Sequence, residues 1–304
     1  MVGEVNIMKK KKSSRLVTRN EKIFSFFMSM IGIIITILSL YPVFYVIIAS
    51  VSKPFFVENG EVMFWVKGFN LESYRQAFAK DGIWLAYLNT FFYTFVGVFA
   101  NMVFTATMAY ALSKQRLLFR KFFTIMTVFT MWFNAGMIPL YMTFVDLKLL
   151  DTRTGIIIGF ALNTYNLIIL KSFFEQVPQS LEEAAFIDGA SNLRIFYHIY
   201  LPLSKPALAT VGMFYGVSRW NGYFWAMNLL KDDNKIPLQV LLKKLIVDQV
   251  ANETEAGIIT MDSLASPTTV IYAIIIIAIV PMAIAYPFVQ KYFKKGATIG
   301  SVKG

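Results

Sequence analysis

Residues 23–52 read IFSFFMSMIGIIITILSLYPVFYVIIASVS and contain no Asp, Glu, Lys or Arg. A helix needs about 20 mostly apolar residues to cross the hydrocarbon core of a membrane. The apolar region of a secretory signal peptide is shorter, at about 7–15 residues, and ends at a cleavage site between small residues. We therefore interpret this stretch as an uncleaved membrane-spanning helix.

Five further windows of the chain are almost as free of charge, and together they hold one charged residue, Arg219. Of the 304 residues, 57% are hydrophobic and 15% are charged, whereas a soluble domain has about 25% charged residues. A soluble core of this size cannot hide six helices that are apolar all round. The sequence predicts an all-α integral membrane protein with six transmembrane helices, approximately over 23–50, 83–112, 122–144, 154–174, 204–230 and 265–291.

The orientation follows from the basic residues in alternate segments. The segments on one side hold 18 Lys and Arg with 6 acids, and those on the other hold 11 with 12 acids. Because an excess of Lys and Arg marks the cytoplasmic side, we expect both termini there, as a basic N-terminus (1–22) and a tail (294–304) around the six-span domain (23–293). The net charge of +11 then reflects topology and attraction to membrane lipid, and we expect no nucleic-acid partner.

Several kinds of site are excluded by composition. The chain has no Cys and one His, His198, so it offers no thiolate and no multi-histidine metal site. No G-x4-G-K-[ST] stretch occurs, so the chain lacks a P-loop for ATP phosphates. We expect neither a catalytic site nor a metal site in this chain.

The longest cytoplasmic piece between spans is 171–205, which contains the loop 176–203 and leads into the fifth span. Ser180 and Glu183 match the S-x-x-E pattern of a capping box, in which a hydroxyl and a carboxylate satisfy the first backbone N–H groups of a helix. The sequence predicts a short helix from Leu181 to about Asp188, ended by Gly189 in a left-handed conformation.

A second short helix is predicted after this turn. Ser191 can cap it, it would cover 192–200, and Pro202 would end it. The small side chains of Ala184 and Ala185 on the first helix would let another surface approach closely. The prediction is a helix-turn-helix along the cytoplasmic membrane surface.

The residues from Glu183 to Pro202 follow the pattern EAA-x3-G-x9-I-x-L-P. This pattern resembles the coupling loop of ABC importer permeases. Residues 149–174, 220–226 and 286–304 resemble the carbohydrate-importer permeases, most closely the branch that handles complex oligosaccharides. The similarity covers nearly all of 23–304.

The resemblance implies the fold of a type I ABC importer permease in a prokaryotic cytoplasmic membrane. It implies as partners a second homologous permease, two ATPase subunits that bind ATP and Mg, an extracellular solute-binding protein, and a sugar or oligosaccharide substrate. This chain would hold no cofactor of its own. The residues that would couple it to the ATPases are Glu182, Glu183, Ala184, Ala185, Asp188, Gly189, Ile199, Leu201 and Pro202. The basic, glycine-containing tail is a second candidate contact, through Lys294, Lys295 and Gly300.

Polar residues inside the spans are candidates for a translocation path, because intramembrane polar groups usually face the protein interior. The stretch 219–225 combines a guanidinium, an amide and aromatic faces, which suit sugar hydroxyls and C–H faces. The candidates for the path are Asn134, Arg219, Trp220, Asn221 and Tyr223. The alternatives are hydrogen bonds between helices and a substrate path mainly in the partner permease.

Two other functions compete with a transport subunit of this kind. A secondary transporter would use buried acids for ion coupling, but the five fully uncharged windows contain none. A membrane-embedded glycan-processing enzyme would need carboxylates with metal-ligand partners, which neither Glu182 and Glu183 nor Asp232 and Asp233 have. Co-purification of an ATPase would separate the permease from both alternatives.

Overall fold

The computed structural model describes residues 19–133, 135–251 and 261–300. Within these residues the chain is helical and contains no β-strand. Three predicted spans are confirmed as long single helices, α1 (Arg19–Ser50), α4 (Ile83–Ser113) and α15 (Pro267–Gly300). These three are long and apolar enough to cross a membrane.

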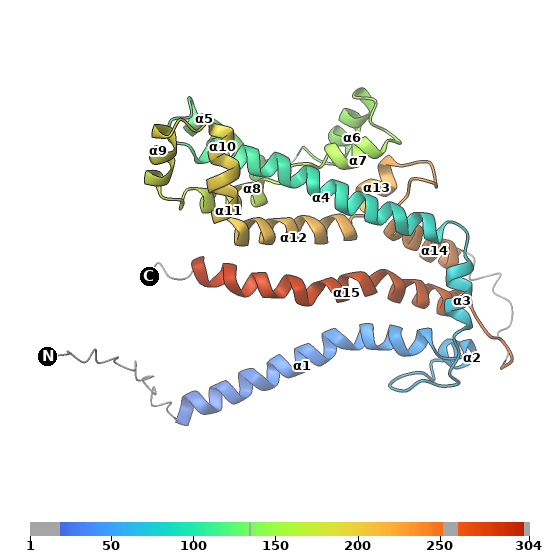
Figure 1. The fold of residues 1–304 in the computed structure, drawn as a ribbon. Coiled ribbons are helices and arrows are strands. Elements are labelled where there is room, and N and C mark those ends of the chain that lie inside the picture. The colour runs from blue at the N-terminus through green and yellow to red at the C-terminus, as the bar shows by residue number, and fades with distance from the viewer. Residues whose placement is uncertain (1–18, 134, 252–260, 301–304) are drawn as a thin grey trace.

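The other helices are shorter. In chain order they are α2 (Pro54–Glu58), α3 (Glu72–Ala79), α5 (Arg120–Trp132), α6 (Met137–Asp146), α7 (Arg153–Ile158), α8 (Thr164–Phe174), α9 (Gln179–Ile187), α10 (Asn192–Ile195), the π-helix η1 (Phe196–Tyr200), α11 (Leu201–Leu203), α12 (Lys205–Asn221), α13 (Phe224–Leu229) and α14 (Leu238–Ala251). In Figure 1, α4, α12, α15 and α1 run along one another in that order, with α1 leaning away.

Three of the predicted spans are not single helices. The window 122–144 forms α5 and α6, bent by 118°, and the window 204–230 forms α12 and α13. The window 154–174 forms α7 and α8, because the side chain of Asn163 accepts a hydrogen bond from the backbone N–H of Asn166 and starts a new helix there. Counting α5 and α6 as one bent span gives up to four candidate membrane helices among the described residues.

Helix α4 lies at the centre of the packing. Small residues on it, Ala106 and Ala109, are buried against the cluster formed with α8, η1 and α12, so these helices approach closely. Around the other half of α4, Tyr93 packs with residues of α6, α7, α13 and α14. By contrast, only 6% of the residues in the most apolar stretch of α1 are buried within this chain. The other side chains of this stretch are left to contact lipid or another subunit.

The two ends of the bundle differ. The beginning of α1 and the end of α15 lie at the same end as α9 and α10, whereas α2, α3, α13 and α14 lie at the opposite end (Figure 1). The two regions singled out in the sequence, 176–203 and 219–225, therefore belong to different parts of the bundle.

Candidate functional site

The first candidate region is the coupling segment, defined here as residues 176–203. Its first helix, α9, begins at Gln179 with Pro178 at the N-cap and no side-chain cap. The predicted capping box of Ser180 and Glu183 is therefore wrong. The helix begins earlier than predicted and places Ser180 inside its first turn, where its hydroxyl is no longer at the N-cap position.

The predicted turn after α9 is confirmed. Gly189 has φ +75°, a left-handed conformation that is strained for residues with a Cβ. The backbone N–H of Ala190 returns to the carbonyl of Ala185 at 2.9 Å, and Ser191 accepts from the N–H of Arg194 at 3.3 Å, as a cap of α10. The angle between α9 and α10 is thus set by this turn.

The second predicted helix does not end at Pro202. The helical path runs through α10, η1 and α11 to Leu203, and α12 begins directly afterwards at Lys205. In an α-helix the ring of Pro202 would clash with the carbonyl four residues earlier. The π-helical turn of η1 widens the helix before this proline and relieves that clash.

The coupling segment presents a mixed polar and apolar surface. Glu183, Ala184, Asp188 and Gly189 are exposed, and Ile187 between them is 87% exposed. Among the other predicted coupling residues, Pro202 is exposed, and Ala185, Ile199 and Leu201 are half-buried.

Glu182 points the other way, into the protein. Its Oε2 lies 2.6 Å from Nζ of Lys114 and accepts the hydroxyl hydrogen bond of Tyr200 at 2.7 Å, and its Oε1 lies 3.3 Å from Arg116. Burial by itself would raise the pKa of Glu182, but these hydrogen bonds and the nearby cations outweigh burial and hold the pKa below its ordinary value. Burial and this carboxylate together raise the pKa of Tyr200, so its hydroxyl stays protonated as a donor.

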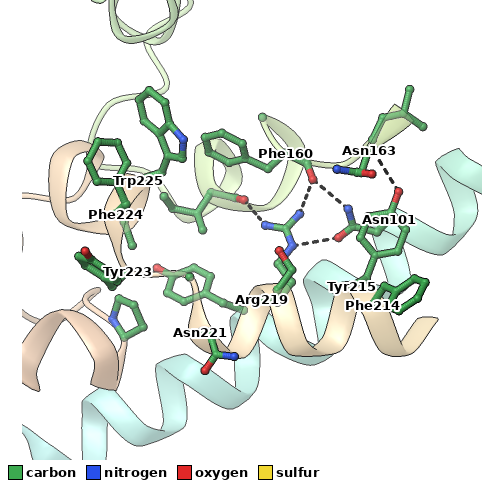
Figure 2. Close-up of a pocket in the computed structure, with 18 of the residues that line it drawn as sticks. Asn101, Phe160, Asn163, Phe214, Tyr215, Arg219, Asn221, Tyr223, Phe224 and Trp225 are labelled. Atoms are coloured by element: carbon green, nitrogen blue, oxygen red, sulfur yellow. Dashed lines mark hydrogen bonds between the residues drawn. The ribbon is translucent and has the colours of Figure 1, made fainter. Parts of the chain in front are cut away.

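The second candidate region is a cavity of about 680 Å³, called here the aromatic pocket. It lies between α4, α8 and α12 and is bounded by the loops after α7 and α12 (Figure 2). Its lining carries aromatic rings, amides and one charged group, Arg219, and includes no Asp, Glu or Lys among the described residues. The main aromatic and amide members are Asn163, Tyr165, Asn166, Phe214, Tyr215, Asn221, Tyr223, Phe224 and Trp225.

The guanidinium of Arg219 is held by backbone carbonyls and one amide. It donates to the carbonyl oxygens of Ile156 at 2.5 Å and Ile157 at 2.9 Å. It also donates to the carbonyl oxygen of Phe160 at 2.9 Å and to Oδ1 of Asn101 at 2.9 Å (Figure 2). Four of the five N–H groups of Arg219 thus donate to uncharged acceptors. A Cβ at Gly97 would lie 2.9 Å from its Nε, so this glycine makes the room in which Arg219 crosses α4.

The structure brings together three of the five residues predicted for a translocation path, since Arg219, Asn221 and Tyr223 line the pocket. Trp220 is not a lining residue. It lies on another face of α12 and is buried there, and its indole N–H donates to the carbonyl oxygen of Ala278 on α15. Asn134 lies outside the described residues.

Four lining residues were not among the residues predicted for a translocation path: Asn101, Tyr165, Phe214 and Tyr215. The signal for the last of these was helical spacing, because Tyr215 lies four residues before Arg219 and therefore on the same face of α12. Asn101 is a polar residue inside the predicted span 83–112, and such residues usually face the protein interior, whereas no local pattern identifies Tyr165; the two reach the pocket from α4 and α8.

The remaining candidates concern the tail and metals. Lys294, Lys295 and Gly300 belong to the helix α15, and the side chains of the two lysines lie outside the described part of the structure. In the described ranges, no three His, Asp or Glu side chains are placed to hold a metal ion.

Comparison with known proteins places these features in a family. Residues 22–298 match the family described as binding-protein-dependent transport system inner membrane component. The polygalacturonan/rhamnogalacturonan transport system permease protein YtcP of Bacillus subtilis (strain 168) is 41% identical over 265 residues, which are 86% of this chain and 92% of that protein. Protein LplC of the same organism is 38% identical over 268 residues, which are 88% of this chain and 90% of that protein.

A solved structure is similar over almost the whole chain. It is the crystal structure of a bacterial ABC transporter involved in the import of the acidic polysaccharide alginate. One of its chains matches with a TM-score of 0.84 and 42% identity, covering 92% of this chain and 100% of that one. The family match spans both the coupling segment and the aromatic pocket, and the chain therefore belongs to the family of inner-membrane components of binding-protein-dependent transport systems, which are permease subunits rather than enzymes.

Proposed function

We propose that this chain is the permease subunit of an ATP-driven importer that takes up acidic oligosaccharides. It pairs with a second, homologous permease, two ATPase subunits bind ATP and Mg²⁺ below it, and an extracellular solute-binding protein delivers the substrate. The chain crosses a prokaryotic cytoplasmic membrane six times with both termini inside, and it holds no cofactor itself. Of the six spans, three are interrupted helices, and two of these, α7 with α8 and α12 with α13, contribute residues to the lining of the aromatic pocket.

The observation that carries the importer assignment is the exposed surface of the coupling segment. Glu183, Ile187 and Asp188 offer a charged and apolar contact surface at the end of the bundle where α1 begins and α15 ends (Figure 1). This segment is the ATPase contact, and Gly189, Ile199, Leu201 and Pro202 set its shape. The end of α15, with Lys294, Lys295 and Gly300, provides a second contact with the ATPases.

The chemistry of the aromatic pocket supports the substrate class. Rings such as Tyr223 and Trp225 can stack on the C–H faces of sugars, while amides can bond the hydroxyls, which is the usual division of labour in ligand pockets. The only charge in the described lining is the cation of Arg219, so a uronate carboxylate meets attraction and no acid that repels it. The relatives named for polygalacturonan and for alginate carry acidic polymers, in agreement with this class.

The test uses the assembled transporter in proteoliposomes with its binding protein. Oligogalacturonate should stimulate ATPase activity and uptake, whereas the same oligosaccharide with its carboxyl groups reduced to alcohols should stimulate both less. Tyr223→Ala should lower uptake, and Tyr223→Phe, which keeps the ring, should retain it. Equal stimulation by the two saccharides would contradict the acidic class, and failure of any ATPase to co-purify would contradict the importer assignment itself.

A further inference from the structure

Helix α4 is tied to the coupling segment by a buried ion pair. The side chains of Lys114, at the end of α4, and Glu182, on α9, are only 9% and 11% exposed. The ammonium of Lys114 also lies over the rings of Tyr110 at 4.0 Å and Tyr200 at 3.6 Å. Because each charge is desolvated and has its partner in place, removing one partner leaves the other buried and unpaired, which is strongly unfavourable.

A second set of contacts links the same end of α4 to α10. The hydroxyl of Tyr110 donates to the carbonyl oxygen of Asn192 at 3.1 Å, and Arg116 bonds the side chain of Asn192. The guanidinium of Arg116 also lies 4.3 Å from the ring centroid of Phe186 on α9. The end of α4 therefore holds both helices of the coupling segment, on either side of the turn at Gly189.

Further along α4, Asn101 binds the loop between α7 and α8 at Phe160 and Ala161, and this loop is called here the floor of the aromatic pocket. Its amide donates to the carbonyl oxygens of Phe160 at 2.8 Å and Ala161 at 2.9 Å, and its oxygen accepts from Arg219. Since Arg219 also bonds Phe160, α4, the loop between α7 and α8, and α12 meet at one point (Figure 2).

At the far end of α4, Asn89 makes a third tie. Its amide donates to the carbonyl oxygens of Asn234 at 2.8 Å and Ile236 at 3.1 Å, in the connection that leads to α14, and its oxygen accepts from Arg153 at 2.9 Å. One continuous helix, α4, thus carries polar anchors at the coupling segment, at the aromatic pocket and at the opposite end of the bundle (Figure 1).

We propose that Glu182 is a positioning residue that locks the coupling segment to α4, so that a displacement of α9 by the ATPase moves α4 and, through Asn101, the floor of the aromatic pocket. This inference rests on the proposed function, because it requires that the ATPase acts on α9. It assigns different roles to two adjacent carboxylates: Glu183 faces the partner, and Glu182 transmits the motion inward.

The experiment measures substrate taken up per ATP hydrolysed in the reconstituted complex. Glu182→Gln removes the charge with little change in shape, and we expect the ratio to fall about tenfold, within the range of typical coupling free energies, while the ATPase still co-purifies. The matched control is Glu175→Gln, which breaks the more exposed ion pairs with Arg120 and Lys171 outside α9 and should leave the ratio unchanged. Glu183→Gln should instead weaken co-purification of the ATPase.

A double variant separates transmission from folding. Lys114→Met with Glu182→Gln leaves no unpaired buried charge, so its thermal stability should recover toward wild type while its uptake per ATP stays low. A wild-type ratio in either Glu182→Gln or the double variant would overturn the lock, and failure of the double variant to assemble would make the pair a folding requirement and also overturn it. Absence of ATPase capture by the wild-type chain would overturn the proposed function instead.

Discussion

Gly189 shows how one residue fixes the shape of the surface offered to a partner. Its φ of +75° is needed for the turn between α9 and α10, and a Cβ built there meets nothing within 4 Å in this chain. The constraint on this position inside the chain is therefore conformational and not steric. Any steric constraint would come from a partner seated on the turn.

Substitutions at Gly189 can distinguish these two constraints. A residue with a Cβ in the left-handed region costs about 1–2 kcal/mol, but Asn tolerates it. If strain dominates, co-purification of the ATPase and uptake should rank Asn above Ala and Ala above Val at this position, with all three proteins inserted normally. If the ATPase packs against the turn, the larger Asn should perform worse than Ala, and that order would contradict a purely conformational role.

The sequence was informative about this turn and misleading about its neighbours. The left-handed glycine and the cap at Ser191 follow from local rules, and the structure confirms both. Which of Glu182 and Glu183 faces inward does not follow from local rules, because it depends on Lys114, which is 68 residues away in the sequence. The predicted box of Ser180 and Glu183 failed because the helix begins earlier than its motif suggests.

At the scale of helices, the length of an apolar window did not determine whether it forms one helix. The windows of α1, α4 and α15 form single helices, and inside α4 the amides of Asn89 and Asn101 donate to the backbone of other segments and do not cap a new helix. In the window of α7 and α8, Asn163 caps a new helix, and the carbonyls left free between the two helices bind Arg219 and Asn101. Such interruptions are tolerated in a membrane protein where the freed backbone groups find partners inside the protein.

The crossing of α4 and α12 provides a test of this arrangement. Gly97→Ala would place a Cβ 2.9 Å from the Nε of Arg219, and overpacking of a filled site costs about 1–3 kcal/mol. Gly216→Ala on α12 is the matched control, because its Cβ would meet nothing within 4 Å and both substitutions gain similar helix propensity. The purified protein with Gly97→Ala should therefore unfold at a lower temperature than the one with Gly216→Ala. Equal melting temperatures of the two variants would mean that Arg219 moves aside freely and does not hold the loop between α7 and α8.

At the scale of the whole molecule, the charge pattern and the fold agree on which segments share an end. The basic residue count predicted that the coupling segment lies on the side of both termini, and the structure places α9 and α10 at the end where α1 begins and α15 ends (Figure 1). The number of spans was harder to predict, because hydropathy reports how apolar a window is and not where its backbone bends. The side of the membrane on which each end lies remains a prediction from the excess of Lys and Arg.

Helix α4 offers the most direct test of that orientation. It has 31 residues, about 46 Å at 1.5 Å per residue, which is more than the hydrocarbon core of about 30 Å. Ala79 and Gln115 lie just outside its two ends, and both are exposed. Since the chain has no Cys, a single Cys at either position is a unique label. In intact cells, a membrane-impermeant maleimide should label Ala79→Cys and leave Gln115→Cys unlabelled until the membrane is opened.

The control for this labelling is uptake, which both variants should retain because neither position belongs to the coupling segment or to the pocket. Labelling of Gln115→Cys from outside would put Lys114, and with it Glu182 and α9, on the outer side of the membrane. An ATPase that hydrolyses cytoplasmic ATP could not then reach the coupling segment. The same pair of cysteines therefore tests two points. One is the orientation of the chain in the membrane. The other is whether α9, which the ion pair of Lys114 and Glu182 holds at this end of α4, lies on the side where an ATPase could move it and, through α4, the aromatic pocket.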